Sequence, residues 1–112
     1  MAGVGSTKLY ENDRVIVWEF VLEPGERTPR HTHEHDYVWY VIEGSRLETF
    51  DEDGRSIGAF DSNTGATFAF ECRGSELIST DGKGLRGPAT HSARNVGAGR
   101  YREILVETKD ER

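Results

Sequence analysis

Three of the four histidines in this 112-residue chain fall within five positions, in the run His31-Thr32-His33-Glu34-His35. On an extended segment, side chains two residues apart share one face and lie about 7 Å from each other, so His31 and His33 point the same way. Imidazole is the commonest protein ligand of transition metals, and two rings at this spacing can converge on one ion. The run is internal and interrupted by other residues, which argues against a purification tag. The spacing therefore favours a metal site over the alternative, a solvated histidine-rich loop.

The elements that must position these histidines are strands. Glycines and prolines divide the chain into short pieces rich in β-branched and aromatic residues, which favours strands over packed helices. Turn signals such as Pro24-Gly25 and Asn63-Thr64-Gly65 separate the pieces. Strands at this spacing predict an all-β sandwich or barrel. The expected strands are 14–22, 38–42, 46–50, 56–60, 67–71, 76–80, 91–96 and 101–108.

Composition restricts the class of protein. The chain has 20 acidic and 14 basic residues and a net charge of -6, and its basic residues are scattered, which argues against a nucleic-acid partner. No apolar stretch approaches the ~18 residues that span a bilayer, and the first residues lack a signal-peptide pattern. We therefore expect a cytoplasmic protein without a membrane partner.

The single cysteine, Cys72, excludes an internal disulfide and is expected to be buried.

The length predicts one domain over residues 1–112 with a small core. Leu, Ile, Val and Phe total 24 of the 112 residues, close to the lower limit for a folded chain. Because segment 38–42 is apolar on both faces, a second copy of the chain is expected to cover its outer face, giving a homodimer. Residues 1–6 and 109–112 are expected to fray.

Two segments resemble the sequence motifs of the cupin family. The first runs from Gly25 to Gly44 and contains the His-x-His pair, and the second ends with His91 followed four residues later by Asn95. The resemblance spans residues 15–107. It implies a double-stranded β-helix, which is a small jelly-roll barrel, as a single cupin domain with its barrel core at about 14–108. It also implies that Gly25 and Gly44, the glycines at the two ends of the first motif, allow the flanking turns.

The resemblance implies the metal ligands as well. His31, His33 and His91 match the three metal-binding histidines of the family, whereas the position of the usual glutamate ligand falls on Tyr37, a neutral phenol. Glu34 alternates away from the histidine face and would need a bulge to reach the ion, as would Asp36. The implied cofactor is a divalent transition metal ion, with Fe(II) as the first choice and zinc, nickel or manganese as alternatives.

A set of three neutral histidines leaves three positions open on a six-coordinate ion, which suits Fe(II) with a chelating substrate and dioxygen. It resembles the cupin dioxygenases of the thiol and diketone type. Tyr37 and His35 are the predicted catalytic residues, and His35 is also a candidate spare ligand. Two alternatives stay open: a non-catalytic module that binds or senses a small molecule, and a metal-free sugar isomerase or epimerase with a histidine base and a tyrosine acid.

The expected partner is a small molecule that is partly apolar. Arg46 and Arg94 are candidates to bind a carboxylate of that molecule. The aromatic residues predicted to line the barrel are Tyr37, Trp39, Tyr40, Phe68, Phe70 and Tyr101.

Overall fold

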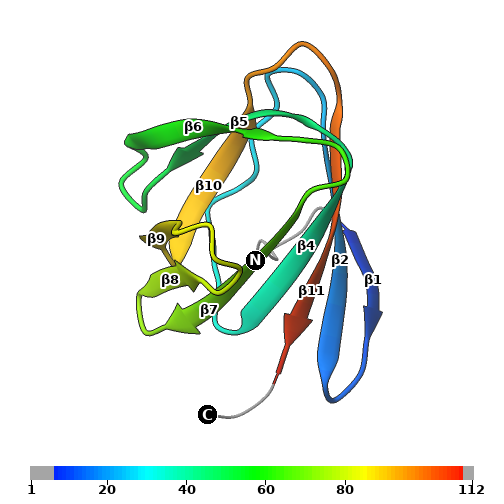
Figure 1. Ribbon diagram of the computed structural model, residues 1–112, viewed down its shortest axis with the longest axis vertical. Coiled ribbons are helices and arrows are strands. Elements are labelled where there is room, and N and C mark those ends of the chain that lie inside the picture. Colours follow the sequence, from blue (N-terminus) through cyan, green and yellow to red (C-terminus); the bar gives the residue numbers. More distant parts are fainter. Residues whose placement is uncertain (1–6, 110–112) are drawn as a thin grey trace.

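The computed structural model describes residues 7–109, and every regular element among them is a strand (Figure 1). Residues 1–6 and 110–112 lie outside this range, and the predicted fraying of the ends falls mostly on them. Lys109 is described, and its backbone N–H donates to the carbonyl oxygen of Arg14 at 2.8 Å. No helix capable of crossing a bilayer occurs within residues 7–109.

The strands form two antiparallel sheets that face each other, and the all-β prediction is confirmed. The larger sheet has seven strands in the order β1-β2-β11-β4-β7-β8-β9, and the smaller has four in the order β3-β10-β5-β6. In Figure 1, β10, β5 and β6 lie on one side of the molecule and β2, β11 and β4 on the other. The strands are β1 (Thr7–Glu11), β2 (Val15–Leu22), β3 (His31–Thr32), β4 (Asp36–Glu43), β5 (Ser45–Phe50), β6 (Ser56–Ser62), β7 (Thr67–Arg73), β8 (Glu76–Ser79), β9 (Arg86–Pro88), β10 (Thr90–Asn95) and β11 (Tyr101–Thr108).

Each of the eight predicted strands has a counterpart whose ends lie within two residues of the expected ones. The three strands that the sequence did not predict are β1, β3 and β9. All five residues of β1 are exposed, so its sequence shows no buried apolar face from which a strand could be predicted. The other two have only two and three residues, too few to show any alternation.

The core lies between the sheets and is built from alternating side chains. On β11, Tyr101, Glu103 and Leu105 are buried and face inward, while their neighbours are partly exposed. On β4, Trp39 points inward, so the next residue, Tyr40, points out and is 50% exposed. The prediction that Tyr40 lines the barrel is therefore wrong, because that strand is apolar on both faces and its pattern does not identify the inner one.

The two motif glycines have different functions. Gly25, after β2, has a φ of +88°, a left-handed conformation that favours glycine in a turn. Gly44 has no such φ. Instead, a Cβ at Gly44 would overlap the backbone of Ser62 and Thr64 in the next loop. The implied turn function therefore holds for Gly25, whereas Gly44 allows two loops to pack closely.

Candidate metal centre

The structure brings His31, His33 and His91 together. His31 on β3 and His91 on β10 are direct partners in the antiparallel register of these strands. His33 lies just beyond β3, where its backbone N–H donates to the carbonyl oxygen of Ala89 at 2.9 Å. One ring nitrogen from each histidine lies within 4.8 Å of those of the other two. Residues almost sixty positions apart in sequence thus supply one group of donors.

Backbone carbonyls fix two of the three rings. Nδ1 of His31 lies 2.9 Å from the carbonyl oxygen of Pro29, and Nδ1 of His91 lies 2.9 Å from that of Pro88. A carbonyl oxygen can only accept, so each Nδ1 carries the proton and each Nε2 has a free lone pair. Metal-bound histidines are held in the same way by a hydrogen bond from the nitrogen that does not bind the ion.

The distance between His33 and His91 also fits a shared ion. Their Nε2 atoms lie 3.2 Å apart. Two nitrogens bound at about 2.1 Å lie about 3.0 Å apart at a right angle and about 3.4 Å apart in a tetrahedron. The observed distance falls between these values, so the pair suits either geometry.

No backbone carbonyl holds the His33 ring among the described residues; stacking and the 3.2 Å contact of its Nε2 with Nε2 of His91 position it instead. Nδ1 of His33 is buried without a hydrogen-bond partner among the described residues. The ring stacks on Tyr37 with a centroid distance of 4.1 Å and an interplanar angle of 12°. The Cys72 thiol donates to the carbonyl oxygen of His33 at 3.2 Å, and Cys72 is buried as expected.

Burial keeps the three rings neutral. It lowers the pKa of His31, and it lowers the pKa of His91 to about 4 with a smaller contribution from the neighbouring His31. For His33, burial and the two other histidines hold the pKa well below its usual value. At neutral pH all three imidazoles are therefore uncharged, which is the form that binds a metal ion.

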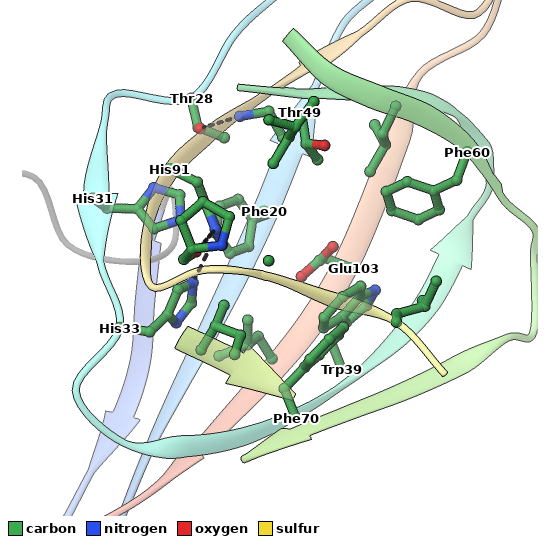
Figure 2. A pocket seen from close by; sticks show the side chains of 18 of the residues that line it. Phe20, Thr28, His31, His33, Trp39, Thr49, Phe60, Phe70, His91 and Glu103 are labelled. Atoms are coloured by element: carbon green, nitrogen blue, oxygen red, sulfur yellow. Dashed lines mark hydrogen bonds between the residues drawn. The ribbon is translucent and has the colours of Figure 1, made fainter. Parts of the chain in front are cut away.

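The three histidines line one cavity of about 280 Å³. Figure 2 shows them on one side of this space, with Trp39, Phe60 and Phe70 across from them. The Trp39 and Phe70 rings are stacked with a centroid distance of 5.6 Å. Most of the remaining wall is aliphatic. A ligand beside the histidines would thus be enclosed mainly by apolar groups.

The predicted catalytic residues occupy different places. Tyr37 lines the cavity, and burial holds its pKa well above the usual value, so its hydroxyl stays protonated. His35 is half-buried and is neither in the histidine cluster nor in the cavity wall. Glu34 is exposed, and the Asp36 carboxylate accepts a hydrogen bond from the backbone N–H of Cys72 at 2.9 Å.

The two arginines proposed to bind a carboxylate do not reach the cavity wall. Arg46 forms an exposed ion pair with Asp61 at 2.8 Å. Arg94 donates from Nε to the carbonyl oxygen of Gly25 at 3.3 Å. Both side chains belong to the outer surface, because they alternate with the inward-facing residues of β5 and β10.

Sequence reasoning missed the acidic group of the cavity, Glu103. Its side chain is buried in the wall, and the Tyr101 hydroxyl donates to its Oε1. Burial raises the pKa of Glu103 to about 8. The signal was its spacing: Tyr101, Glu103 and Leu105 share one face of β11, so an inward tyrosine predicts an inward glutamate.

Comparisons with known proteins identify the fold of this chain. No protein-family model matches the sequence, and no curated protein matches it. A cupin domain from Bordetella pertussis Tohama I superposes with a TM-score of 0.68 and 21% identity, over 93% of this chain and 91% of that chain. An RmlC-like cupin with a double-stranded β-helix from Methanocaldococcus jannaschii gives 0.56 and 15%, over 96% and 80%. The chain has the cupin fold.

A further structural match is a named enzyme. The polyketide cyclase RemF from Streptomyces resistomycificus superposes with a TM-score of 0.54 and 21% identity, over 92% of this chain and 63% of that chain. The predicted double-stranded β-helix is thus confirmed. At these identities the similarity concerns the fold alone, and the activity must be argued from the site itself.

Proposed function

We propose that this cupin chain binds one divalent transition metal ion through His31, His33 and His91 and catalyses metal-dependent oxygenation of a small organic molecule. The observation that carries the proposal is the convergence of three neutral ring nitrogens on the wall of a mostly apolar cavity. Fe(II) is the first choice of ion, and zinc, nickel and manganese are the alternatives.

The donor set fits such an ion. Two of the three rings present Nε2 because backbone carbonyls hold their Nδ1 protons, and the third presents Nε2 beside that of His91. Bound Fe(II) would supply dioxygen activation. The chain itself orients the rings, excludes water with its aromatic wall, and keeps two protons inside the cavity, on Tyr37 and Glu103.

Metal content tests the ligand set. The wild-type chain, incubated with Fe(II) or Zn(II) and freed of unbound ion, is expected to retain a single ion, and His31→Ala, His33→Ala and His91→Ala are each expected to retain far less. His35→Ala is the matched control, because the fourth histidine lies outside the cluster. Metal content that is equal in all five proteins would contradict the assignment.

Oxygen uptake tests turnover. The Fe(II)-loaded chain is mixed with a panel of thiols, diketones and phenols, and dioxygen consumption is followed. Uptake with one member, absent from the three histidine variants, supports the oxygenase. Bound metal without uptake for any member supports the non-catalytic binding module. A wild-type chain that binds no metal favours the metal-free isomerase.

The remaining partners are also proposals. We propose that the ligand is a small molecule rather than a nucleic acid or a membrane, and that the chain acts in the cytoplasm. A homodimer is proposed on the evidence of the outer sheet face described below.

A further inference from the structure

Glu103 is the only acidic residue in the cavity wall, among the residues that the structure describes. Its side chain is 6% exposed, and its surroundings include Phe20, Leu105 and Trp39. Acidic side chains are rarely buried so completely unless they are paired. Within residues 7–109, Glu103 forms no ion pair with an arginine or a lysine, so an ion pair does not explain its position.

A chain of hydroxyl groups holds one of its two oxygens. Tyr101 donates its single proton to Oε1 of Glu103. The hydroxyls of Ser62 and Tyr101 lie 3.2 Å apart, and since the Tyr101 proton is already used, Ser62 is the donor of that pair. Ser62 is completely buried and Tyr101 almost so. The carboxyl group is therefore held in one orientation.

The second oxygen is available to a ligand. The carboxyl group of Glu103 is directed into the cavity (Figure 2), and the hydrogen bond from Tyr101 engages Oε1 rather than Oε2. Polar groups enclosed by apolar residues are normally hydrogen-bonded, so Oε2 is the atom of Glu103 to which a ligand in the cavity would bond.

The protonation state determines what kind of partner fits. Burial raises the pKa of Glu103 to about 8, although the hydrogen bond from Tyr101 lowers it. At neutral pH the carboxyl group keeps its proton, and that proton lies on Oε2 because Oε1 accepts from Tyr101. A neutral carboxyl of this kind donates a hydrogen bond to an uncharged oxygen.

We propose that protonated Glu103 donates a hydrogen bond from Oε2 to a carbonyl oxygen of the ligand, and that the ligand is a small, uncharged, mostly apolar ketone or aldehyde. This rests on the proposed function in one respect, that the ligand occupies the cavity beside the histidines. It does not require the metal ion. A ligand carboxylate fits poorly, because Arg86, the one arginine of the described wall, is exposed and paired with Glu76 at 3.0 Å.

The effect of pH on binding isolates Glu103. The other titratable groups in the wall are Tyr101 on the same strand, Tyr37 on β4, the three histidines and Arg86 on β9. Both tyrosines have a pKa raised above the usual value, and the histidines have theirs lowered. Between pH 6.5 and 9, Glu103 is thus the wall group expected to lose its proton. The hydrogen-bond donor, the protonated carboxyl group of Glu103, is present below pH 8 and is lost as the pH rises above 8.

Acetophenone is a suitable probe, because it has one carbonyl oxygen, no proton to donate and no second oxygen to chelate a metal. Its affinity for the full chain is measured by calorimetry from pH 6.5 to 9, with and without Zn(II). For the wild type we expect a loss of roughly threefold to tenfold with rising pH, the value of one hydrogen bond. Glu103→Gln, whose amide donates at every pH, is expected to show no such loss.

Two further variants sharpen the test. Glu107→Gln is the matched control, because Glu107 is buried on the same face of β11 but lies outside the cavity wall and accepts from Trp18. It is expected to keep the wild-type pH profile. Tyr101→Phe is expected to move the midpoint of the profile to higher pH, since the hydrogen bond that favours the Glu103 carboxylate is removed.

Three results would overturn the inference: no acetophenone binding by the wild type, a flat wild-type profile, or a Glu103→Gln profile equal to the wild-type one. Failure of the metal assignment would appear separately. It would show in the ion content of the histidine variants, while the acetophenone profile of the metal-free chain kept its dependence on Glu103.

Discussion

The three histidine rings are not held alike. Two donate their Nδ1 protons to the carbonyls of Pro29, in the segment before β3, and Pro88, at the end of β9, and both prolines have a fixed φ. The third, His33, stacks against Tyr37, and its Nδ1 has no hydrogen-bond partner within residues 7–109. The rings of His31 and His91 are therefore oriented by the backbone before an ion arrives, whereas the ring of His33 is oriented by Tyr37 and by its 3.2 Å contact with Nε2 of His91.

Asn95 of the second motif is structural. Its side chain is completely buried and makes four hydrogen bonds: Nδ2 donates to the carbonyls of Leu22 and Gly99, and Oδ1 accepts from Ser45 Oγ and Gly97 N–H. Asn95→Ala would leave several of these groups buried without partners. We expect the free energy of unfolding to fall by about 3 kcal/mol, measured by urea denaturation.

The exposed Asn63 provides the control for that variant. Asn63→Ala is expected to change the free energy of unfolding by less than about 0.5 kcal/mol, because its side chain lies on the surface. Equal effects at the two asparagines would contradict the structural role of Asn95.

At the residue scale, the sequence identified the histidines but not Glu103. The histidines could be predicted because two of them are close in the sequence and all three match histidines of the motifs, and both signals can be seen without the fold. Glu103 shares a face with Tyr101, which was expected to line the barrel, but it was missed because both faces of 101–108 mix polar and apolar residues and a glutamate is not expected in a core. Only the neighbouring strands β2 and β4, contributed by distant parts of the chain, determine which face is buried.

At the scale of elements, the connection from β4 to β5 depends on close packing at Gly44. A Cβ there would overlap the backbone of Ser62 and Thr64, and the Gly44 N–H donates to the Thr64 hydroxyl at 2.9 Å. Gly44→Ala would force the two loops apart. We expect a loss of more than about 2 kcal/mol in the free energy of unfolding, measured by urea denaturation.

Gly99 is a matched glycine without that constraint. It has no left-handed φ, and an added Cβ would meet no atom within 4 Å. Gly99→Ala is expected to leave stability unchanged or slightly increased, since alanine restricts the unfolded chain. The packing explanation fails if both substitutions have the same effect.

The strands themselves were largely predictable, because turn residues mark the ends of eight of them. What the sequence did not provide was the pairing. β2 and β11 are neighbours although about eighty residues separate them, and β10 pairs with both β3 and β5. Which strands pair depends on how the two sheets pack around a shared core. The sequence pattern within a single strand does not contain that information.

At the scale of the whole molecule, the outer face of the larger sheet carries an apolar row. Val17, Val106, Val38 and Ala69 are partners across the neighbouring strands β2, β11, β4 and β7. Tyr40, 50% exposed, lies beside Ile104 on the same face. An apolar face of this extent on a small protein is typical of an interaction surface, and its position on β4 agrees with the expected dimer.

A charge in the centre of that face should separate the copies. The wild type is expected to sediment as a dimer, and Val38→Asp as a monomer, because dimerisation would bury an unpaired carboxylate. Val96→Asp is the matched control: Val96 is 41% exposed against 40% for Val38, but it follows β10 in the smaller sheet. A monomeric wild type, or a Val38→Asp variant that remains a dimer, would show that the row does not join two copies. A dimer lost only in Val38→Asp would place the interface on the face of the larger sheet opposite the cavity, leaving the ligand access to the histidines.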